Sequence, residues 1–387
     1  MHEVSQHVVP RSRASQTHAG MRESILAALE PILFSSPAHG YVARSEFEER
    51  FAAIVEQPFA CAVHSGTIGL YLALRACGVR VGDEVVTVGN SDVSTTAAIS
   101  HCGATPVLCD VLPSDYTIDT DAVEACLGPR TKALLPVDLY GHPADVRRLR
   151  EIADRHGLTI IEDAALATGA RDHGRPVGAF ADATVYSFAP VKPLGSVGNG
   201  AMVTSHDPRL ARSIRALAGY GQVPDVRAER AGQQAHVVEG INVPLDPLQA
   251  ALLTVKLANL EAWTGRRREL ADLYRRELPD SSVQMPQFRS ESEPTFRSFT
   301  VLVDDQQHVY EGLQRAGIDA VLHYAPPVFR QPVYASGLRG SDRLPVTEHL
   351  SAHLVCLPVT PELTNADVAY VATTLGALVE RIDVDGH

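Results

Sequence analysis

The chain contains 387 residues, of which 45% are hydrophobic and 21% charged, as in ordinary globular proteins. The 46 acidic residues outnumber the 34 lysines and arginines, so the net charge is −12 and binding of nucleic acid through its phosphates is not expected. No apolar run approaches the roughly 20 residues of a membrane-spanning helix, so we expect no membrane partner. A phosphorylated small molecule stays compatible with this composition, because a few local donors can outweigh a diffuse negative field.

The first 20 residues, MHEVSQHVVPRSRASQTHAG, lack the apolar segment of a secretory signal. We interpret residues 1–20 as a mobile tail; an arm that packs on a partner subunit is the alternative. The six cysteines show no CxxC spacing, and most lie in apolar surroundings such as PVLCDV. Buried, reduced thiols are the simplest interpretation, and they indicate a cytoplasmic protein.

Residues 60–205 alternate short apolar runs with amphipathic, helix-like stretches such as ADVRRLREIADRHG, which a glycine closes. This alternation predicts an α/β domain, residues 21–255, with a mostly parallel sheet that helices cover on both faces. In such sheets the ligand lies beyond the carboxyl ends of the strands. Seven apolar runs are expected to be the strands: ACAVHS, DEVVTVG, TPVLCDV, KALLPVD, LTIIEDA, ATVYSFA and GAMVTS.

A long helical pattern, DPLQAALLTVKLANLEAWTGRRRELADLYRREL, follows Gly240. Its arginines and glutamates give it a charged outer face, and its leucines and alanines give it an apolar stripe. We expect this helix to lead from the large domain into a smaller α+β domain, residues 256–387.

Lys192 lies in a turn rich in proline and glycine, in SFAPVKPLGSVGNGAMVTS, directly after one predicted strand and before another. A lone lysine is most often a solvated surface charge. At a strand end, flanked by glycines that let a ligand approach, it is also suited to attack an aldehyde. Such an amine must be partly neutral, which burial and nearby cations favour.

Two further motifs follow predicted strands. Asp163, in TIIEDAALATGA, could hold a protonated ring nitrogen, although a helix cap is the simpler interpretation of this aspartate alone. The segment Ser65 to Thr67, in HSGTIGLYLAL, ends one strand and opens a helix. Its free backbone N–H groups, hydroxyls and helix dipole form a phosphate cradle, although the same residues also make an ordinary N-cap.

Taken together, in this order and spacing, the three motifs resemble the DegT/StrS-type family of sugar aminotransferases. The resemblance runs from about Glu46 to the C-terminal region and includes GDEVVTV, GATPVLCDV, EDAALATGA, SFAPVKPLG, GINVPLDPLQAA and HYAPPVF. It implies the aspartate aminotransferase fold, which is the fold type I of enzymes that use pyridoxal 5′-phosphate (PLP).

The resemblance also implies a role for each matching residue. Lys192 would hold PLP as a Schiff base and carry protons, and Asp163 would pair with the pyridine nitrogen. Asn242, in GINVPL, would reach the phosphate of the neighbouring subunit, so the working unit would be a homodimer with shared active sites. The remaining phosphate-binding residues would be Ser65, Gly66, Thr67 and Ser187.

Three positions depart from the family pattern. Leu166 replaces a glutamine that bonds the phenolic oxygen of the cofactor, Asp92 replaces an aromatic residue that stacks on its ring, and Pro244 replaces an arginine of the cross-subunit motif. Simple drift within the family is one explanation. The other is that Asp92, or its neighbour Asn90 or Ser91, supplies a polar contact elsewhere in the pocket. The loss of one buried hydrogen bond, about 1–3 kcal/mol, leaves PLP binding intact in either case.

We therefore expect an aminotransferase that takes an amino group from glutamate or glutamine and passes it to a nucleotide-linked keto sugar or a cyclitol. His323 and Tyr324, in HYAPPVF, are candidate substrate-binding residues, with a packing or interface role as the alternative. A PLP-dependent elimination or decarboxylation on the same scaffold is the second hypothesis, and an idle regulatory relative is the third. A related branch with histidine at the lysine position deoxygenates sugars, and Lys192 argues against that reaction.

Overall fold

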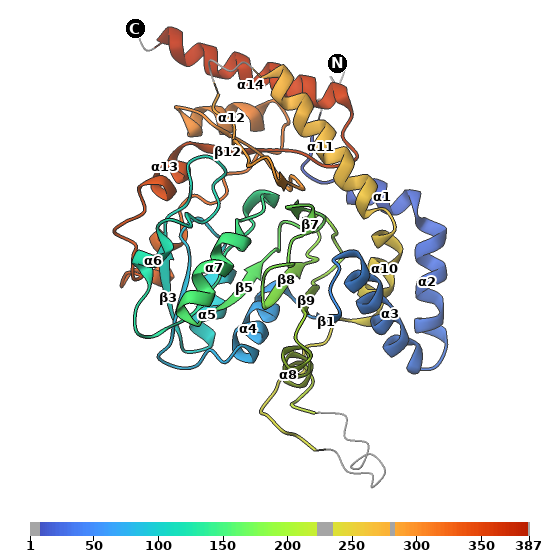
Figure 1. Ribbon diagram of the computed structural model, residues 1–387. Helices are drawn as coiled ribbons and strands as arrows, with labels where there is room; N and C mark the ends of the chain where they lie inside the picture. Colours follow the sequence, from blue (N-terminus) through green and yellow to red (C-terminus); the bar gives the residue numbers. More distant parts are fainter. Residues whose placement is uncertain (1–7, 223–234, 279–282, 386–387) are drawn as a thin grey trace.

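The computed structural model describes residues 8–222, 235–278 and 283–385 (Figure 1). A central sheet with helices on both sides forms the larger part of the molecule, and a smaller unit lies above it in this view. The smaller unit contains α11 (Leu260–Glu277), α12 (Gln306–Arg315) and α14 (Asn365–Asp385). Within the described residues, no helix is both long and apolar enough to cross a lipid bilayer.

The central sheet has seven strands, each at one of the seven predicted runs: β1 (Phe59–Val63), β2 (Glu84–Val88), β3 (Thr105–Cys109), β4 (Thr131–Leu134), β5 (Thr159–Asp163), β8 (Ala183–Ser187) and β9 (Ala201–Ser205). Their order is β1-β9-β8-β5-β4-β2-β3. All neighbouring pairs are parallel except the two that include β9, which runs antiparallel to β1 and β8. The predicted mostly parallel sheet is confirmed.

Both faces of this sheet are buried. In β1, Cys61 packs into a cluster with α4 (Gly66–Ala76), whereas the next residue, Ala62, faces a second cluster with α3 (Ala38–Ile54). Because successive side chains of a strand point to opposite faces, the strands carry apolar residues at nearly every position. This explains why the sequence shows continuous apolar runs there, and not an alternation of apolar and polar residues.

Five of the described helices begin at an aspartate that accepts a hydrogen bond from an N–H group of the first turn. The remaining helices are α1 (Ala14–Gly20), α2 (Arg22–Phe34), α5 (Val93–His101), α6 (Val123–Cys126), α7 (Val146–His156), α8 (Pro208–Ala218), α10 (Pro247–Leu257) and α13 (Pro345–His353). Two small antiparallel sheets complete the fold, formed by β6 (Arg171–Asp172), β7 (Arg175–Pro176) and β10 (Ser292–Glu293), and by β11 (Phe299–Leu302) and β12 (Leu354–Leu357).

The predicted long helix is two helices, α10 and α11, separated at Ala258 and Asn259. Leu260, at the start of α11, belongs to the core of the large unit. Tyr274, near its end, stacks on Phe299 with ring centroids 4.8 Å apart in the core of the small unit. The two cores therefore divide within α11, a few residues beyond the boundary expected after residue 255.

The N-terminal segment differs from the expected mobile tail over residues 8–20; residues 1–7 lie outside the described residues. Val9 is fully buried in the core of the small unit and forms a parallel bridge with Ile318. Arg13 pairs with Asp367 at the start of α14. The physical reason is the short apolar stretch around Val9. Its burial in this core stabilises the folded state by more free energy than the loss of conformational entropy costs.

Candidate active site

A cavity of about 240 Å³ lies at the carboxyl ends of the central strands, where the strand order predicts a ligand site. Its walls come from the segments after β1, β2, β4 and β5, from the loop between β8 and β9, and from Tyr324. Nine of the predicted site residues line it: Ser65, Gly66, Thr67, Asp92, Asp163, Leu166, Ser187, Lys192 and Tyr324. The structure thus brings together residues that are up to 259 positions apart in the chain (324 − 65 = 259).

Lys192 lies in a tight turn, in which its own backbone N–H donates to the carbonyl of Ala189 at 2.9 Å. The turn is compact: a side chain at Gly195 would place its Cβ 2.4 Å from the carbonyl oxygen of Pro190. Burial, together with the positive charge of Arg297, lowers the pKa of Lys192 to about 8, while the charges of Asp163 and Asp92 oppose this shift. An amine in this environment is partly neutral near neutral pH, as a nucleophile must be.

Asp163 ends β5 and is buried. Its Oδ2 accepts a hydrogen bond from the hydroxyl of Thr95 at 2.9 Å, and its Oδ1 accepts one from the N–H of Ala165 at 3.1 Å. Thr95 in turn hydrogen-bonds the hydroxyl of Ser91 at 2.8 Å. Burial raises the pKa of Asp163, and the two donors and Lys192 act in the opposite direction. Sequence reasoning missed Thr95; its place three residues after Asp92, one turn into α5, is the only signal that could have indicated it.

The N-terminus of α4 forms one end of the cavity. Ser65 caps this helix and accepts a hydrogen bond from Ile68 N–H at 3.4 Å. The next residue, Gly66, lies close to Ser187 at the end of β8, and a Cβ on this glycine would be 3.4 Å from that of the serine. The start of α4 therefore lines the cavity at Gly66 and Thr67, beside the hydroxyls of Ser65 and Ser187, and a helix N-terminus with neighbouring hydroxyls is suited to bind a phosphate.

Asp92 caps α5: its Oδ1 accepts a hydrogen bond from Ser94 N–H at 2.8 Å. Of the three polar candidates in this segment, Asp92 and Ser91 line the cavity. Asn90 does not; its amide donates to the carbonyl of Tyr116 at 3.3 Å. Leu166 also lines the cavity and is almost fully buried, so it contributes an apolar wall where the family pattern has a glutamine.

His323 and Tyr324 stack on each other, with ring centroids 4.8 Å apart and an interplanar angle of 14°. Tyr324 lines the cavity and His323 does not. The carbonyl of His323 accepts a hydrogen bond from the hydroxyl of Tyr140 at 2.8 Å. Burial and the positive charge of Arg297 lower the pKa of His323 to about 4, so its ring is neutral at neutral pH.

Asn242 lies apart from this cavity. It is exposed and lines a different cavity of about 730 Å³, together with Pro244, Tyr220 and Arg215. Within one chain it does not reach Lys192. Its predicted role in a neighbouring subunit therefore stays a prediction.

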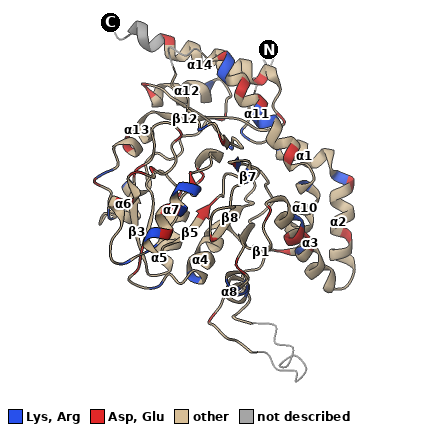
Figure 2. Ribbon diagram, in the orientation of Figure 1, with Lys and Arg blue, Asp and Glu red and all other residues tan. Residues whose placement is uncertain are grey.

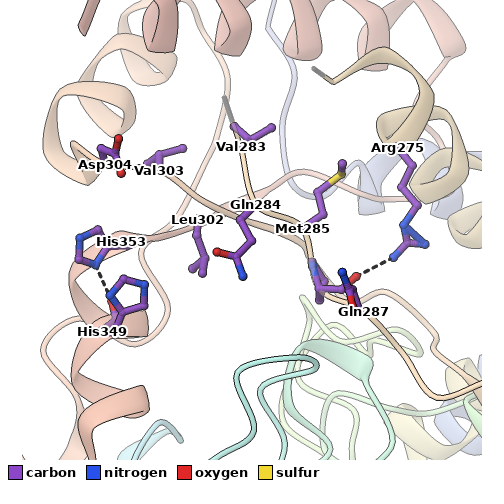
Figure 3. A pocket seen from close by; sticks show the side chains of 11 residues that line it. Arg275, Val283, Gln284, Met285, Gln287, Leu302, Val303, Asp304, His349 and His353 are labelled. Carbon is purple, nitrogen blue, oxygen red and sulfur yellow. Dashed lines mark hydrogen bonds between the residues drawn. The ribbon is translucent and has the colours of Figure 1, made fainter. Parts of the chain in front are cut away.

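A third cavity, of about 740 Å³, lies in the small unit (Figure 3). Arg275, Gln284, Asp304, His349 and His353 are among its lining residues. None of the predicted site residues lines it. The chemistry-bearing residues therefore converge on the cavity around Lys192 and not on this larger one.

Comparison with known proteins identifies the family. The sequence model of the DegT/DnrJ/EryC1/StrS aminotransferase family matches residues 20–376 of this chain. The chain is 39% identical over 338 residues to the dTDP-3-amino-3,4,6-trideoxy-α-D-glucose transaminase of Streptomyces venezuelae, covering 87% of each chain. It belongs to the DegT/DnrJ/EryC1/StrS aminotransferase family. The erythromycin biosynthesis sensory transduction protein EryC1 of Saccharopolyspora erythraea is 40% identical over 332 residues, which cover 86% of this chain and 88% of EryC1.

The fold comparison agrees with this assignment. The X-ray structure of S. venezuelae DesV in complex with a ketimine intermediate matches with a TM-score of 0.89, at 37% identity, over 97% of this chain and 99% of DesV. As a family member, the protein is a PLP-dependent aminotransferase of fold type I, and both expectations from its sequence are confirmed.

The residues of the cavity fit PLP. The amine of Lys192 has a lowered pKa, and the buried carboxyl of Asp163 is oriented by Thr95. The helix start at Gly66 lines the cavity and is suited to hold a phosphate, and Ser187 lies beside it. These three features stand at different walls of one cavity, as a cofactor with an aldehyde, a ring nitrogen and a phosphate requires.

Proposed function

We propose that this aminotransferase moves an amino group from glutamate or glutamine to the keto group of a nucleotide-linked sugar or a cyclitol in secondary-metabolite or cell-surface sugar biosynthesis. The convergence of Lys192, Asp163 and the N-terminus of α4 on one cavity carries the proposal. The relatives support the acceptor class, because their names include a dTDP-linked and two UDP-linked sugar aminotransferases.

The roles of the residues follow from their positions. PLP, when bound, supplies an electron sink for the carbon that loses its proton. Hydrogen bonds from Thr95 and Ala165 hold the carboxyl of Asp163 at the far wall, where its ionised form would stabilise a protonated ring nitrogen. The Nζ atom of Lys192 accepts and returns a proton, for which a pKa of about 8 is suitable near neutral pH. Tyr324 and Leu166 line the cavity, and their apolar surfaces would help to keep water away from the bound substrates.

A direct test uses the donor half-reaction alone. Purified enzyme loaded with PLP should convert to the pyridoxamine form when glutamate or glutamine is added, with a change in visible absorbance. The variant Lys192→Ala should lose both the conversion and the absorbance of the linked cofactor. If no amino acid converts the wild-type enzyme, aminotransfer is the wrong function; release of ammonia or carbon dioxide without a keto substrate would indicate a lyase. A protein that ignores added PLP would indicate a regulator.

We also propose that the enzyme is a homodimer. The surface of α2 supports this: none of its side chains is buried, yet Leu26, Leu33 and Phe34 are among them. Its charged residues are confined to Arg22, Glu23 and Glu30 (Figure 2). A groove of about 610 Å³ runs between α2 and α10 and includes Val197, from the loop that carries Lys192. An exposed apolar patch of this kind is typical of an interface between chains, which supports the proposed homodimer.

Subunit mixing tests the dimer and the role of Asn242 together. Neither Lys192→Ala nor Asn242→Ala homodimers should be fully active. In a mixed dimer, one site combines the intact Lys192 of one chain with the intact Asn242 of the other, and the second site lacks both. About half of the dimers are mixed after random assortment, so mixing should restore up to about one quarter of the wild-type activity. No recovery in confirmed mixed dimers would contradict a shared site. The six unpaired cysteines support a cytoplasmic location, which fractionation of producing cells would check.

A further inference from the structure

Lys256 is a buried cation that the proposed mechanism does not use. It lies in α10, is only 4% exposed, and forms no ion pair within the part of the chain that the structure describes. Of the 34 lysines and arginines in the chain only three are lysines, namely Lys132, Lys192 and Lys256. A buried ammonium requires acceptors for its N–H groups, so the acceptors of Lys256 indicate what it does.

These acceptors connect Lys256 with the loop that carries Lys192, residues 188–200, which we call the Lys192 loop. Nζ of Lys256 donates a hydrogen bond to the carbonyl of Gly195, which is buried. The same Nζ lies 3.2 Å from Nε2 of His18 in α1. Since an ammonium can only donate, the imidazole of His18 is the acceptor and is neutral; burial and the charge of Lys256 lower the pKa of His18 accordingly. Two of the three lysines of the chain therefore meet at one loop.

Gly195 closes the turn that contains Lys192. A Cβ on this glycine would lie 2.4 Å from the carbonyl oxygen of Pro190, so the two backbone segments on either side of the lysine are in contact. The next residue, Ser196, donates to the carbonyl of Phe188 from its N–H at 2.8 Å and from its hydroxyl at 2.7 Å. Because the turn is this tight, a rotation of the Gly195 peptide group would displace Lys192 as well.

Other contacts hold the Lys192 loop against α10. Gln249, two turns before Lys256 on this helix, accepts a hydrogen bond from the N–H of Val197 at 3.1 Å. Leu194 is fully buried in the core that it shares with α10. These contacts fix where the loop lies, whereas the charged hydrogen bond from Lys256 fixes the direction of a peptide group within it. Hydrogen bonds from a charged donor are the stronger kind, so this one is suited to select a single conformation.

We propose that Lys256 is a positioning residue that holds the Lys192 loop in the conformation in which Lys192 attaches to PLP, and that His18 keeps Lys256 in place. The inference concerns the attachment of PLP and does not depend on which donor or acceptor the enzyme uses. Without the ammonium, the buried carbonyl of Gly195 loses its donor, and other conformations of the turn become populated. The apparent affinity of the linkage falls in proportion to the competent fraction.

His18 extends this connection to the N-terminal segment. The helix α1 lies beside α10 (Figure 1), and the hydroxyl of Thr17, the residue before His18, donates to the carboxylate of Glu362. Glu362 stands before α14, so α1 is fastened both to the small unit and to Lys256. The segment at the start of the chain thus supports the Lys192 loop from the side that faces away from the cavity.

The test compares Lys256→Met with a matched control, Lys132→Met, in the binding of two cofactor forms to the apoenzyme. Methionine keeps an apolar stem but donates no hydrogen bond. Lys132 lies near the start of β4, at the opposite edge of the sheet from the cavity. PLP can attach to Lys192 through its aldehyde, whereas pyridoxamine phosphate has no aldehyde and binds without a linkage. Absorbance and calorimetric titrations give the affinity for each form.

The expected change is in the ratio of the two affinities. Lys256→Met should lower the affinity for PLP by about tenfold or more and change the affinity for pyridoxamine phosphate by less than about threefold. Lys132→Met should change neither. Lys192→Ala gives the lower limit of the ratio, because this variant cannot form the linkage at all.

Two further variants test the hydrogen bonds themselves. Lys256→Gln has a side chain as long as that of Lys256→Met but keeps an N–H donor, so it should retain more of the preference for PLP. His18→Leu should lower this preference by about threefold in the wild type and by nothing further in the Lys256→Met background, because the histidine acts through the lysine.

The outcomes distinguish positioning from a general structural role. An equal fall in the affinities for both cofactor forms would show that Lys256 supports the whole site, and would overturn the proposal. An unchanged ratio in Lys256→Met, or an equal loss in Lys256→Gln and Lys256→Met, would overturn it too. Additive losses from His18→Leu and Lys256→Met would refute the part assigned to His18. A wild-type ratio equal to that of Lys192→Ala would contradict the attachment at Lys192 itself.

Discussion

Glu162 and Asp138 form a buried carboxyl pair on the opposite face of β5 from Asp163, and we expect it to make stability depend on pH. Both are almost fully buried, and the interaction between the two carboxyl groups shifts the pKa of each. Oδ1 of Asp138 accepts from Ala144 N–H at 2.9 Å, but its Oδ2 has no donor partner. Two ionised carboxylates can only accept hydrogen bonds, so one of the two groups must carry a proton before it can donate to the other. Burial is the main cause that raises the pKa of both, for Glu162 to about 7.

The expected magnitude follows from this shift. The pKa of Glu162 rises from its ordinary value of 4.5 to about 7, a difference of about 2.5 units. This difference corresponds to about 3 kcal/mol in the free energy of unfolding. Because the folded-state pKa is raised, the folded protein holds a proton that the unfolded chain has released between pH 4.5 and 7. The stabilisation is therefore complete below pH 4.5 and is lost as the pH rises to about 7. Glu162→Gln is neutral at every pH and should lack this loss.

Urea unfolding of the wild type, Glu162→Gln and Glu49→Gln at pH 5 and pH 8 tests this prediction. Glu49 is an exposed carboxylate of α3, so its removal controls for a general change in charge. The free energy of unfolding should fall between the two pH values by up to about 3 kcal/mol more in the wild type than in Glu162→Gln. An equal fall in all three proteins would refute the shared proton.

Three further outcomes are expected around the cofactor site. Thr95→Val removes the hydroxyl that donates to Asp163 at 2.9 Å, so affinity for PLP should fall by about 1–3 kcal/mol in an absorbance titration; unchanged affinity would contradict this. Asp92→Ala should destabilise the protein by about 1 kcal/mol, because the N–H group of Ser94 loses its acceptor at the start of α5. Asp92→Asn keeps an acceptor there, so thermal unfolding should be unchanged, but the loss of the negative charge should lower the pKa of Lys192. Because that pKa is about 8, attachment of PLP to the apoenzyme should accelerate roughly tenfold from pH 7 to pH 9 and then level off, whereas an ordinary lysine would continue to accelerate.

Much of the large domain could be predicted because its signals are local. Each strand is a short, mostly apolar run. Asp163 ends one strand and Lys192 lies in the loop that follows another, where the fold places ligands. The position of Ser65 before a helix is equally visible in the sequence, since a capping serine needs only its own neighbours.

The rest of the site depends on contacts that no local pattern encodes. Thr95 reaches Asp163 across 68 positions of the chain, and the positive charge of Arg297 acts on Lys192 from the small unit. Both are ordinary residues in their own segments, a threonine within a helix and an arginine before a strand. The break between α10 and α11 was missed because Ala258 and Asn259 do not interrupt the helical pattern of the sequence.

The packing of Val9 also bears on the order in which the protein can fold. Val9 is synthesised 309 positions before its partner Ile318, and Arg13 is likewise synthesised long before its partner Asp367. The small unit therefore closes only after residues 9 to 367 have all been made, because its core joins segments from both ends of this range. A chain that stops before Ile318 would leave Val9 without a core to enter, even with every strand of the large sheet complete.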